Sequence, residues 1–93
     1  MDKKKAYDAL VALAKAGRID AMTFKFKRRG AIRESEYTCS DIIYDPNADK
    51  VIVNWSVNGE HHEPSYLRDF VDWFVISLYN EVMKTRLIDR NLF

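Results

Sequence analysis

The stretch that most constrains this fold is residues 65–83, because it is apolar around most of the circumference of a helix. Its apolar residues recur at spacings of three and four, the period of one helix face. They are Leu67, Phe70, Val71, Phe74, Val75, Leu78 and Val82. Trp73 and Ile76 widen the stripe, and Asp72 interrupts it too early for a membrane span, which takes about 20 apolar residues. The pattern predicts a long C-terminal helix, beginning at Ser65, that is covered from more than one direction.

A first helix is predicted over residues 2–16. Asp2 is a preferred capping residue for its N-terminal end. A narrow apolar stripe follows, made of Ala6, Ala9, Leu10, Leu13 and Ala14. Gly17 is predicted to end this helix in the left-handed conformation that glycine adopts without strain.

Three stretches between the helices show the two-residue alternation of half-buried strands: residues 22–29, 34–44 and 51–57. Residues 45–50 are rich in turn formers, and Asn58-Gly59 is a strong signal for a two-residue hairpin. Residues 60–63 are therefore predicted to return as a short edge strand.

These turns predict the pairing of the strands. Tyr44 should lie opposite Val51, Ile42 opposite Val53, and Trp55 beside His62. One sheet face is then predicted to carry Phe24, Phe26, Ile42, Tyr44, Val51, Val53 and Trp55. The other is predicted to carry Lys25, Lys27, Arg29, Tyr37, Cys39, Ile43, Ile52 and Asn54. A register slip of one residue would exchange the two faces of the second strand.

The order of these elements predicts one α+β domain over residues 1–93. It has two layers: an antiparallel sheet of three to four strands, and the N-terminal helix together with the long C-terminal helix. A helix of ~20 residues is about 30 Å long and a six-residue strand only about 20 Å. The C-terminal end of the long helix should therefore extend beyond the sheet.

The residue types that carry catalysis or bind metals are few. His61 and His62 are adjacent on a predicted strand, so their side chains point to opposite faces and do not converge on one ion. Cys39 has no orienting acid or oxyanion donor in view, and the three glycines form no phosphate loop. The sequence therefore predicts a protein that is not an enzyme and has no cofactor or metal. A single cysteine and no signal peptide predict a cytoplasmic location.

The charges divide along the chain although their sum is only +1. Residues 1–33 carry ten Lys or Arg against three acids, and residues 34–74 carry two against nine. The candidate acidic surface is Glu34, Glu36, Asp41, Asp45, Asp49, Glu60 and Glu63, with Asp69 and Asp72 beyond them. The candidate basic surface is Lys25, Lys27, Arg28, Arg29 and Arg33. Cations in this number can hold phosphates, so the basic stretch predicts a nucleic-acid-binding alternative.

In size, order of elements and charge layout, the chain resembles the small phage-encoded inhibitors of CRISPR effectors. Some members of that family present carboxylates where the effector expects DNA phosphates. The resemblance implies a non-catalytic module that binds a host protein or nucleoprotein through the acidic residues named above. The helix–three strands–helix order also describes the double-stranded-RNA-binding domain. That family needs a basic start to its last helix. Here the matching residues are Glu60, Glu63, Asp69 and Asp72, so this assignment is rejected.

Apolar surface beyond what one sheet can cover predicts a homodimer as a further arrangement. The residues that would form its interface are Trp73, Ile76, Leu92 and Phe93. The first helix is the alternative cover for the same surface within one chain.

Overall fold

The computed structural model describes residues 2–17 and 19–91, with side chains described as far as residue 85. The elements are α1 (Lys3–Ala16), β1 (Met22–Phe26), β2 (Ser35–Asp45), β3 (Lys50–Val57), β4 (Glu60–His61), β5 (Ser65–Tyr66), the 3₁₀ helix η1 (Leu67–Asp69) and α2 (Asp72–Asn91). The strands form one antiparallel sheet in the order β1-β2-β3-β4, with β5 also paired to β3. The predicted α+β fold is confirmed.

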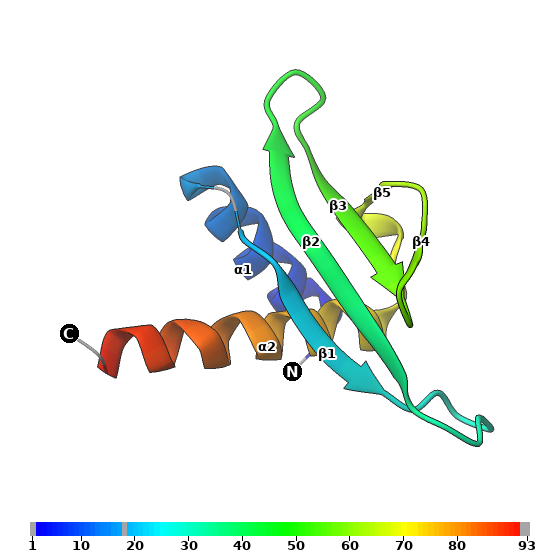
Figure 1. The fold of residues 1–93 in the computed structure, drawn as a ribbon. Helices are drawn as coiled ribbons and strands as arrows, with labels where there is room; N and C mark the ends of the chain where they lie inside the picture. The colour runs from blue at the N-terminus through cyan, green and yellow to red at the C-terminus, as the bar shows by residue number, and fades with distance from the viewer. Residues whose placement is uncertain (1, 18, 92–93) are drawn as a thin grey trace.

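Both helices lie on one side of the sheet, and the other side is open (Figure 1). α2 crosses behind the strands, and its C-terminal part extends beyond β1, as its length predicted (Figure 1). α1 packs against α2 and β2, so it covers part of the apolar surface that the sheet leaves bare. The two layers enclose the core between the helices and one face of the sheet.

α1 forms where the sequence predicted it. The Asp2 carboxylate accepts a hydrogen bond from the Lys5 amide at 2.9 Å, which satisfies one free N–H of the first turn. Ala6, Leu10 and Ala14 are buried, and the two alanines let the helix approach its neighbours closely. The left-handed conformation predicted for Gly17 is wrong: its φ of 166° is extended backbone, although its N–H still bonds to the Leu13 carbonyl.

The two predicted hairpins are confirmed. Tyr44 pairs with Val51, and the strands are joined by a four-residue turn in which Asp49 has a φ of 52°. Asn58 and Gly59 have φ values of 51° and 82°, the positive values that a type I′ turn requires at both central residues. This turn brings β4 back along β3.

A β-bulge in β2 overturns part of the predicted sheet faces. The pairing shifts between Cys39 and Asp41, so Ser40 is an extra residue with no partner of its own on β3. One added residue moves every earlier side chain of the strand to the opposite face. Tyr37 and Cys39 are therefore buried in the core beside Ile42, and their predicted place on the open face is wrong.

The long helix begins seven residues later than predicted. Ser65 and Tyr66 pair with β3, and the chain then makes the 3₁₀ turn η1 before α2 begins. Two amides, those of Phe74 and Val75, bond to the Val71 carbonyl as the first turn of α2 forms. Leu67 and Phe70, whose spacing predicted an α-helix, are buried as expected, but Leu67 lies in the 3₁₀ turn and Phe70 directly after it.

The contact between the sheet and α2 is the centre of the core. Phe74 and Leu78 are 2% and 0% exposed. Phe74 meets Phe24 edge to face at 5.3 Å and stacks on Phe70 at 4.1 Å. Aromatic pairs in these geometries stabilise beyond their buried area. The prediction that the strands and the C-terminal helix share one apolar contact is confirmed.

Candidate functional site: an aromatic cleft and a basic finger

A cleft of about 600 Å³ opens at one end of the molecule, between the sheet and the start of α2. Its aromatic wall, called here the aromatic cleft, consists of Tyr37, Trp55, His62, Phe70, Trp73 and Phe74. Arg28, Glu60 and Asp69 supply charges of both signs to its lining. The cleft has the size and the apolar wall with few polar groups that binding sites share.

The sheet side of the cleft is fixed by Trp55 on β3. Its indole Nε1 donates to the Glu63 carbonyl at 3.1 Å and approaches the Ser65 hydroxyl at 3.4 Å. Its ring stacks with His62 at 4.3 Å, which confirms the pairing predicted from the Asn58-Gly59 turn. These contacts hold the indole in one orientation.

The helix side is fixed by Trp73 in the first turn of α2. Trp73 stacks on Phe26 with centroids 4.3 Å apart and planes 7° apart, and it meets Tyr37 edge to face at 5.4 Å. Both rings sit on the core face of the sheet, so the indole bridges the helix and two strands. The wall of the cleft is built from β2, β3, the residues after β4 and the start of α2.

Lys3 of α1 binds the backbone at residues 68 and 70, next to the cleft. Its ammonium donates to the Phe70 carbonyl at 2.5 Å and to the Arg68 carbonyl at 3.3 Å, and lies 3.8 Å from the Asp72 carboxylate. The three partners belong to the corner between η1 and α2. α1 thus stabilises the corner that presents Phe70 to the cleft.

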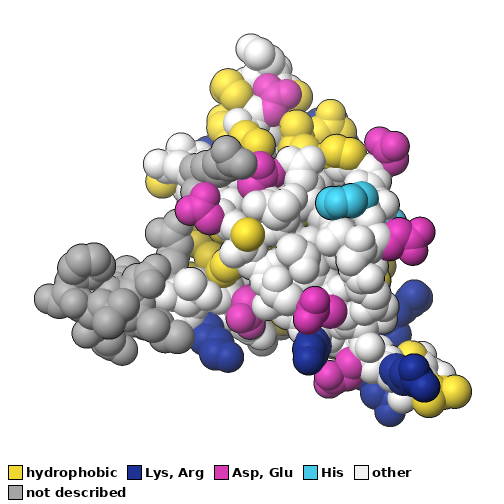
Figure 2. Space-filling model, viewed as in Figure 1, with side chains coloured by type: hydrophobic (Ala, Val, Ile, Leu, Met, Phe, Trp, Pro, Cys, Tyr) yellow, Lys and Arg dark blue, Asp and Glu magenta, His cyan; other side chains and the backbone are white. Residues whose placement is uncertain are grey.

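The predicted basic strand is a loop over most of its length. β1 ends at Phe26, so residues 27–34, called here the basic finger, project beyond the end of the sheet (Figure 1). The Ala31 amide bonds to the Arg28 carbonyl at 2.9 Å, and Gly30 has a φ of 84°, so a tight turn closes the finger. Lys27, Arg28, Arg29 and Arg33 are exposed on it. Figure 2 shows Lys and Arg side chains gathered there around a hydrophobic tip.

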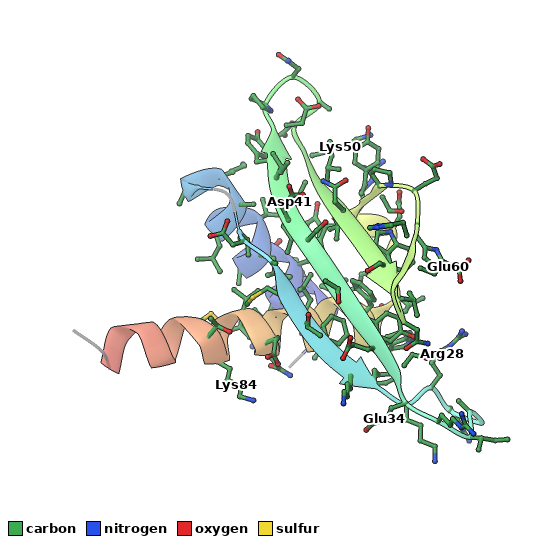
Figure 3. The ribbon with its side chains drawn as sticks, viewed as in Figure 1. Arg28, Glu34, Asp41, Lys50, Glu60 and Lys84 are labelled. Atoms are coloured by element: carbon green, nitrogen blue, oxygen red, sulfur yellow. The ribbon has the colours of Figure 1, made fainter. Side chains whose placement is uncertain are left out.

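The predicted acidic residues are distributed along the open face and edges of the sheet. Glu34 and Glu36 lie at the finger end, and Asp45 and Asp49 lie in the turn at the far end of β2. Asp41 lies between them, bonded to the Asn54 amide, and Figure 3 labels it well away from Glu34 and Glu60. Glu60 lines the aromatic cleft; Glu63 is exposed beside it.

Cations alternate with these acids rather than facing them from a separate surface. Lys25 lies opposite Glu36 in the pairing of β1 with β2. Lys50 lies opposite Asp45, and Lys15 is 3.9 Å from the Asp49 carboxylate. The structure thus brings Glu60 and Arg28, one residue from each predicted charged set, together at the aromatic cleft.

The candidate reactive groups are Cys39 and the two adjacent histidines. Cys39 is completely buried, and desolvation raises the pKa of its thiol to about 12, so the nucleophilic thiolate is scarce at neutral pH. Among the described residues, no three His, Cys, Asp or Glu side chains gather as a metal site would require. His62 stacks on Trp55, and His61 is exposed on β4.

The predicted dimer surface divides between described and undescribed residues. Trp73 and Ile76 are half-buried and pack against this chain's own core. Leu92 and Phe93 lie outside the described residues. The homodimer stays a prediction.

Two parts of the site were absent from the sequence prediction. The aromatic cleft has no linear motif, because its wall depends on where η1 turns the chain. The exposed tip of the basic finger could have been found in the sequence, because Ile32 stands in a basic stretch that contains Gly30.

No helix in the described ranges combines the length and the apolar character needed to cross a membrane. No protein family, curated protein or solved structure matches this chain.

Proposed function

We propose that this chain is a non-catalytic protein-binding module of the cytoplasm, and that it inhibits a host nucleoprotein such as a CRISPR effector. The observation that carries the proposal is the aromatic cleft. Tryptophan and tyrosine are enriched among the residues that dominate binding energy at protein interfaces, especially inside a polar rim. Trp55 and Trp73 face the cleft from opposite layers, and both are half-buried, so each retains surface to offer a partner.

The charges around the cleft suit a protein side chain better than a uniformly charged ligand. Arg28 lines the cleft together with Glu60 and Asp69, so the lining carries both signs. A volume of about 600 Å³ accepts one or two large side chains of an inserted loop. The acids along the open face of the sheet, from Glu36 to Asp45, supply a second contact for a groove that normally holds DNA phosphates.

The two tryptophans give a direct assay, because they are the only ones in the chain and both line the cleft. A purified CRISPR effector added to the protein should shift the tryptophan emission and slow cleavage of the effector's target DNA. Glu60→Arg with Asp69→Arg should weaken both effects at least tenfold. The matched control is Asp8→Arg, an equally exposed charge reversal on α1, which should leave both effects unchanged.

The mimicry part of the proposal has its own test. Reversing Glu34, Asp41, Asp45 and Asp49 to lysine should abolish inhibition while the circular-dichroism spectrum stays that of the parent. Inhibition that survives all four reversals would remove the acidic surface from the proposal. Inhibition that also survives the paired change at Glu60 and Asp69 would remove the cleft.

Nucleic-acid binding is the second candidate function, and the basic finger favours it. Four exposed cations lie within residues 27–34 against the single acid Glu34. Binding through phosphates weakens with salt at a slope of about −0.9 per phosphate for duplex DNA. Lys27→Ala should weaken binding at low salt without changing the unfolding midpoint. A flat titration at low salt would end this candidate.

A further inference from the structure

The tip of the basic finger carries the most exposed large apolar side chain among the described residues. Ile32 is 92% exposed, compared with 53% for Val71 and 38% for Ile43. It belongs to the basic finger, which projects beyond the end of the sheet (Figure 1). An isoleucine exposed to this extent gains the free energy of burial only when a partner covers it.

The groups around Ile32 define the chemistry of that partner. Lys27, Arg28, Arg29 and Arg33 belong to the same finger, and within the described part of the chain no ion pair holds any of them. The acids near them are Glu34 in the finger and Glu36 at its base, and Glu60 and Asp69 line the aromatic cleft together with Arg28. The tip itself is cationic on both arms, with one apolar contact at its end.

We infer that the basic finger enters the major groove of duplex DNA, with its cations on the flanking phosphates and Ile32 against the base edges. This inference rests on the second candidate function. The major groove is about 12 Å wide and admits a two-stranded ribbon. The hydrogen bond from the Ala31 amide to the Arg28 carbonyl closes a tight turn within the finger. At the floor of the groove, the apolar group that an isoleucine can cover is the C5 methyl of thymine.

The composition of the finger favours duplex DNA over two other anionic partners. Single strands are held by aromatic rings that stack on bases, and residues 27–34 contain none. An anionic bilayer is bound through apolar area together with cations, and here the apolar area is essentially one side chain. Three of the four cations are arginines, whose planar guanidinium matches the oxygens of a phosphate.

The test compares two short duplexes that differ only in the thymine methyl: alternating dA·dT and alternating dA·dU. The full chain should bind the dA·dT duplex about fourfold more tightly, the effect of burying one methyl group. Ile32→Ala should bind the two duplexes equally. The matched control, Ile43→Ala, removes a partly exposed isoleucine from the open sheet face and should keep the fourfold preference.

Measurement at several salt concentrations separates failure of the inference from failure of the function beneath it. Contact with four phosphates gives a slope of about −3.6 in log affinity against log salt. That slope with equal affinity for both duplexes overturns the Ile32 contact and leaves the nucleic-acid function standing. No binding to either duplex at low salt overturns both. Binding to phosphatidylserine vesicles but to neither duplex, lost in Ile32→Ala, would replace DNA with a membrane surface.

Discussion

Replacing Phe74 with alanine should destabilise this protein more than most single changes. Its ring is 2% exposed and lies between the sheet and the start of α2. It stacks on Phe70 at 4.1 Å and meets Phe24, Tyr37 and Trp55 edge to face at 5.3 to 5.7 Å. No neighbouring side chain can fill the space without giving up one of these contacts.

The expected loss in free energy of unfolding is about 4 kcal/mol, within the usual range of about 3–5 kcal/mol for a buried Phe→Ala change. A chain of 93 residues has about 5–14 kcal/mol in total. The variant should therefore lose about a third or more of the stability. The melting temperature should fall by about 15 °C or more. Phe74→Leu keeps most of the apolar volume and should lose only about 1–1.5 kcal/mol.

Urea unfolding followed by tryptophan fluorescence measures this directly, because Trp55 and Trp73 lie 5.7 and 5.9 Å from the Phe74 ring. The urea midpoint should drop while the slope of the transition stays near that of the parent. A loss below about 1 kcal/mol for Phe74→Ala would mean that the ring is replaceable. In that case the contact between the sheet and α2 is not what holds the two layers together.

Two further predictions follow from the helix start and the buried thiol. Val71→Ser should raise the free energy of unfolding by about 1 kcal/mol, because an exposed valine holds a capping position where serine is preferred; chemical denaturation checks it against Val71→Ala. The pKa of Cys39 rises from 9.0 to about 12 on folding, so above pH 9.0 the unfolded chain ionises first and stability falls as pH rises towards 12. The slope there should approach about 1.4 kcal/mol per pH unit. The hydrogen bond to Asp49 raises the pKa of Tyr44, so Tyr44 also lowers the stability as the pH rises. The contribution of Cys39 is the difference in slope between the parent protein and Cys39→Ala.

The sheet was predictable where local chemistry decides the backbone. Asn58-Gly59 specifies a turn with two positive φ values, and that turn alone fixes Ser56 opposite His61. The turn after Asp45 fixes the other hairpin in the same way. Hydrophobic alternation then identified β3 and the whole of β1, although the predicted range of β1 ran three residues too far.

The errors occur where tertiary contacts overrule the local pattern. The residues around Ser40 give no sequence signal for a bulge, because many residue types occur in bulges. The shift is visible only in the pairing of β2 with β3. Leu67 and Phe70 fit a helical period, but pairing of Ser65 and Tyr66 with β3 delays the helix. Because Leu67 and Phe70 are three residues apart, the 3₁₀ turn buries both side chains in the same core that an α-helix would have used.

The candidate sites follow the same division. The cations of the basic finger were evident as a sequence run, although not their place beyond the sheet. The aromatic cleft was not evident from the sequence. Phe70 and Trp73 reach it because the helix starts late, and Tyr37 reaches it because the bulge in β2 turns its side chain inward.

The order of the elements also exposes apolar surface during translation, before α2 is made. All five strands precede α2, which supplies the apolar cover for Phe24. A ribosome adds about 5–20 residues per second, so the 20 residues of α2 take about 1–4 s to be made after the sheet is complete. Until then the part of the apolar sheet face that α2 covers stays exposed to neighbouring nascent chains on the polysome. Chains released early, before Leu78, would keep that surface and be prime clients for chaperones and proteases.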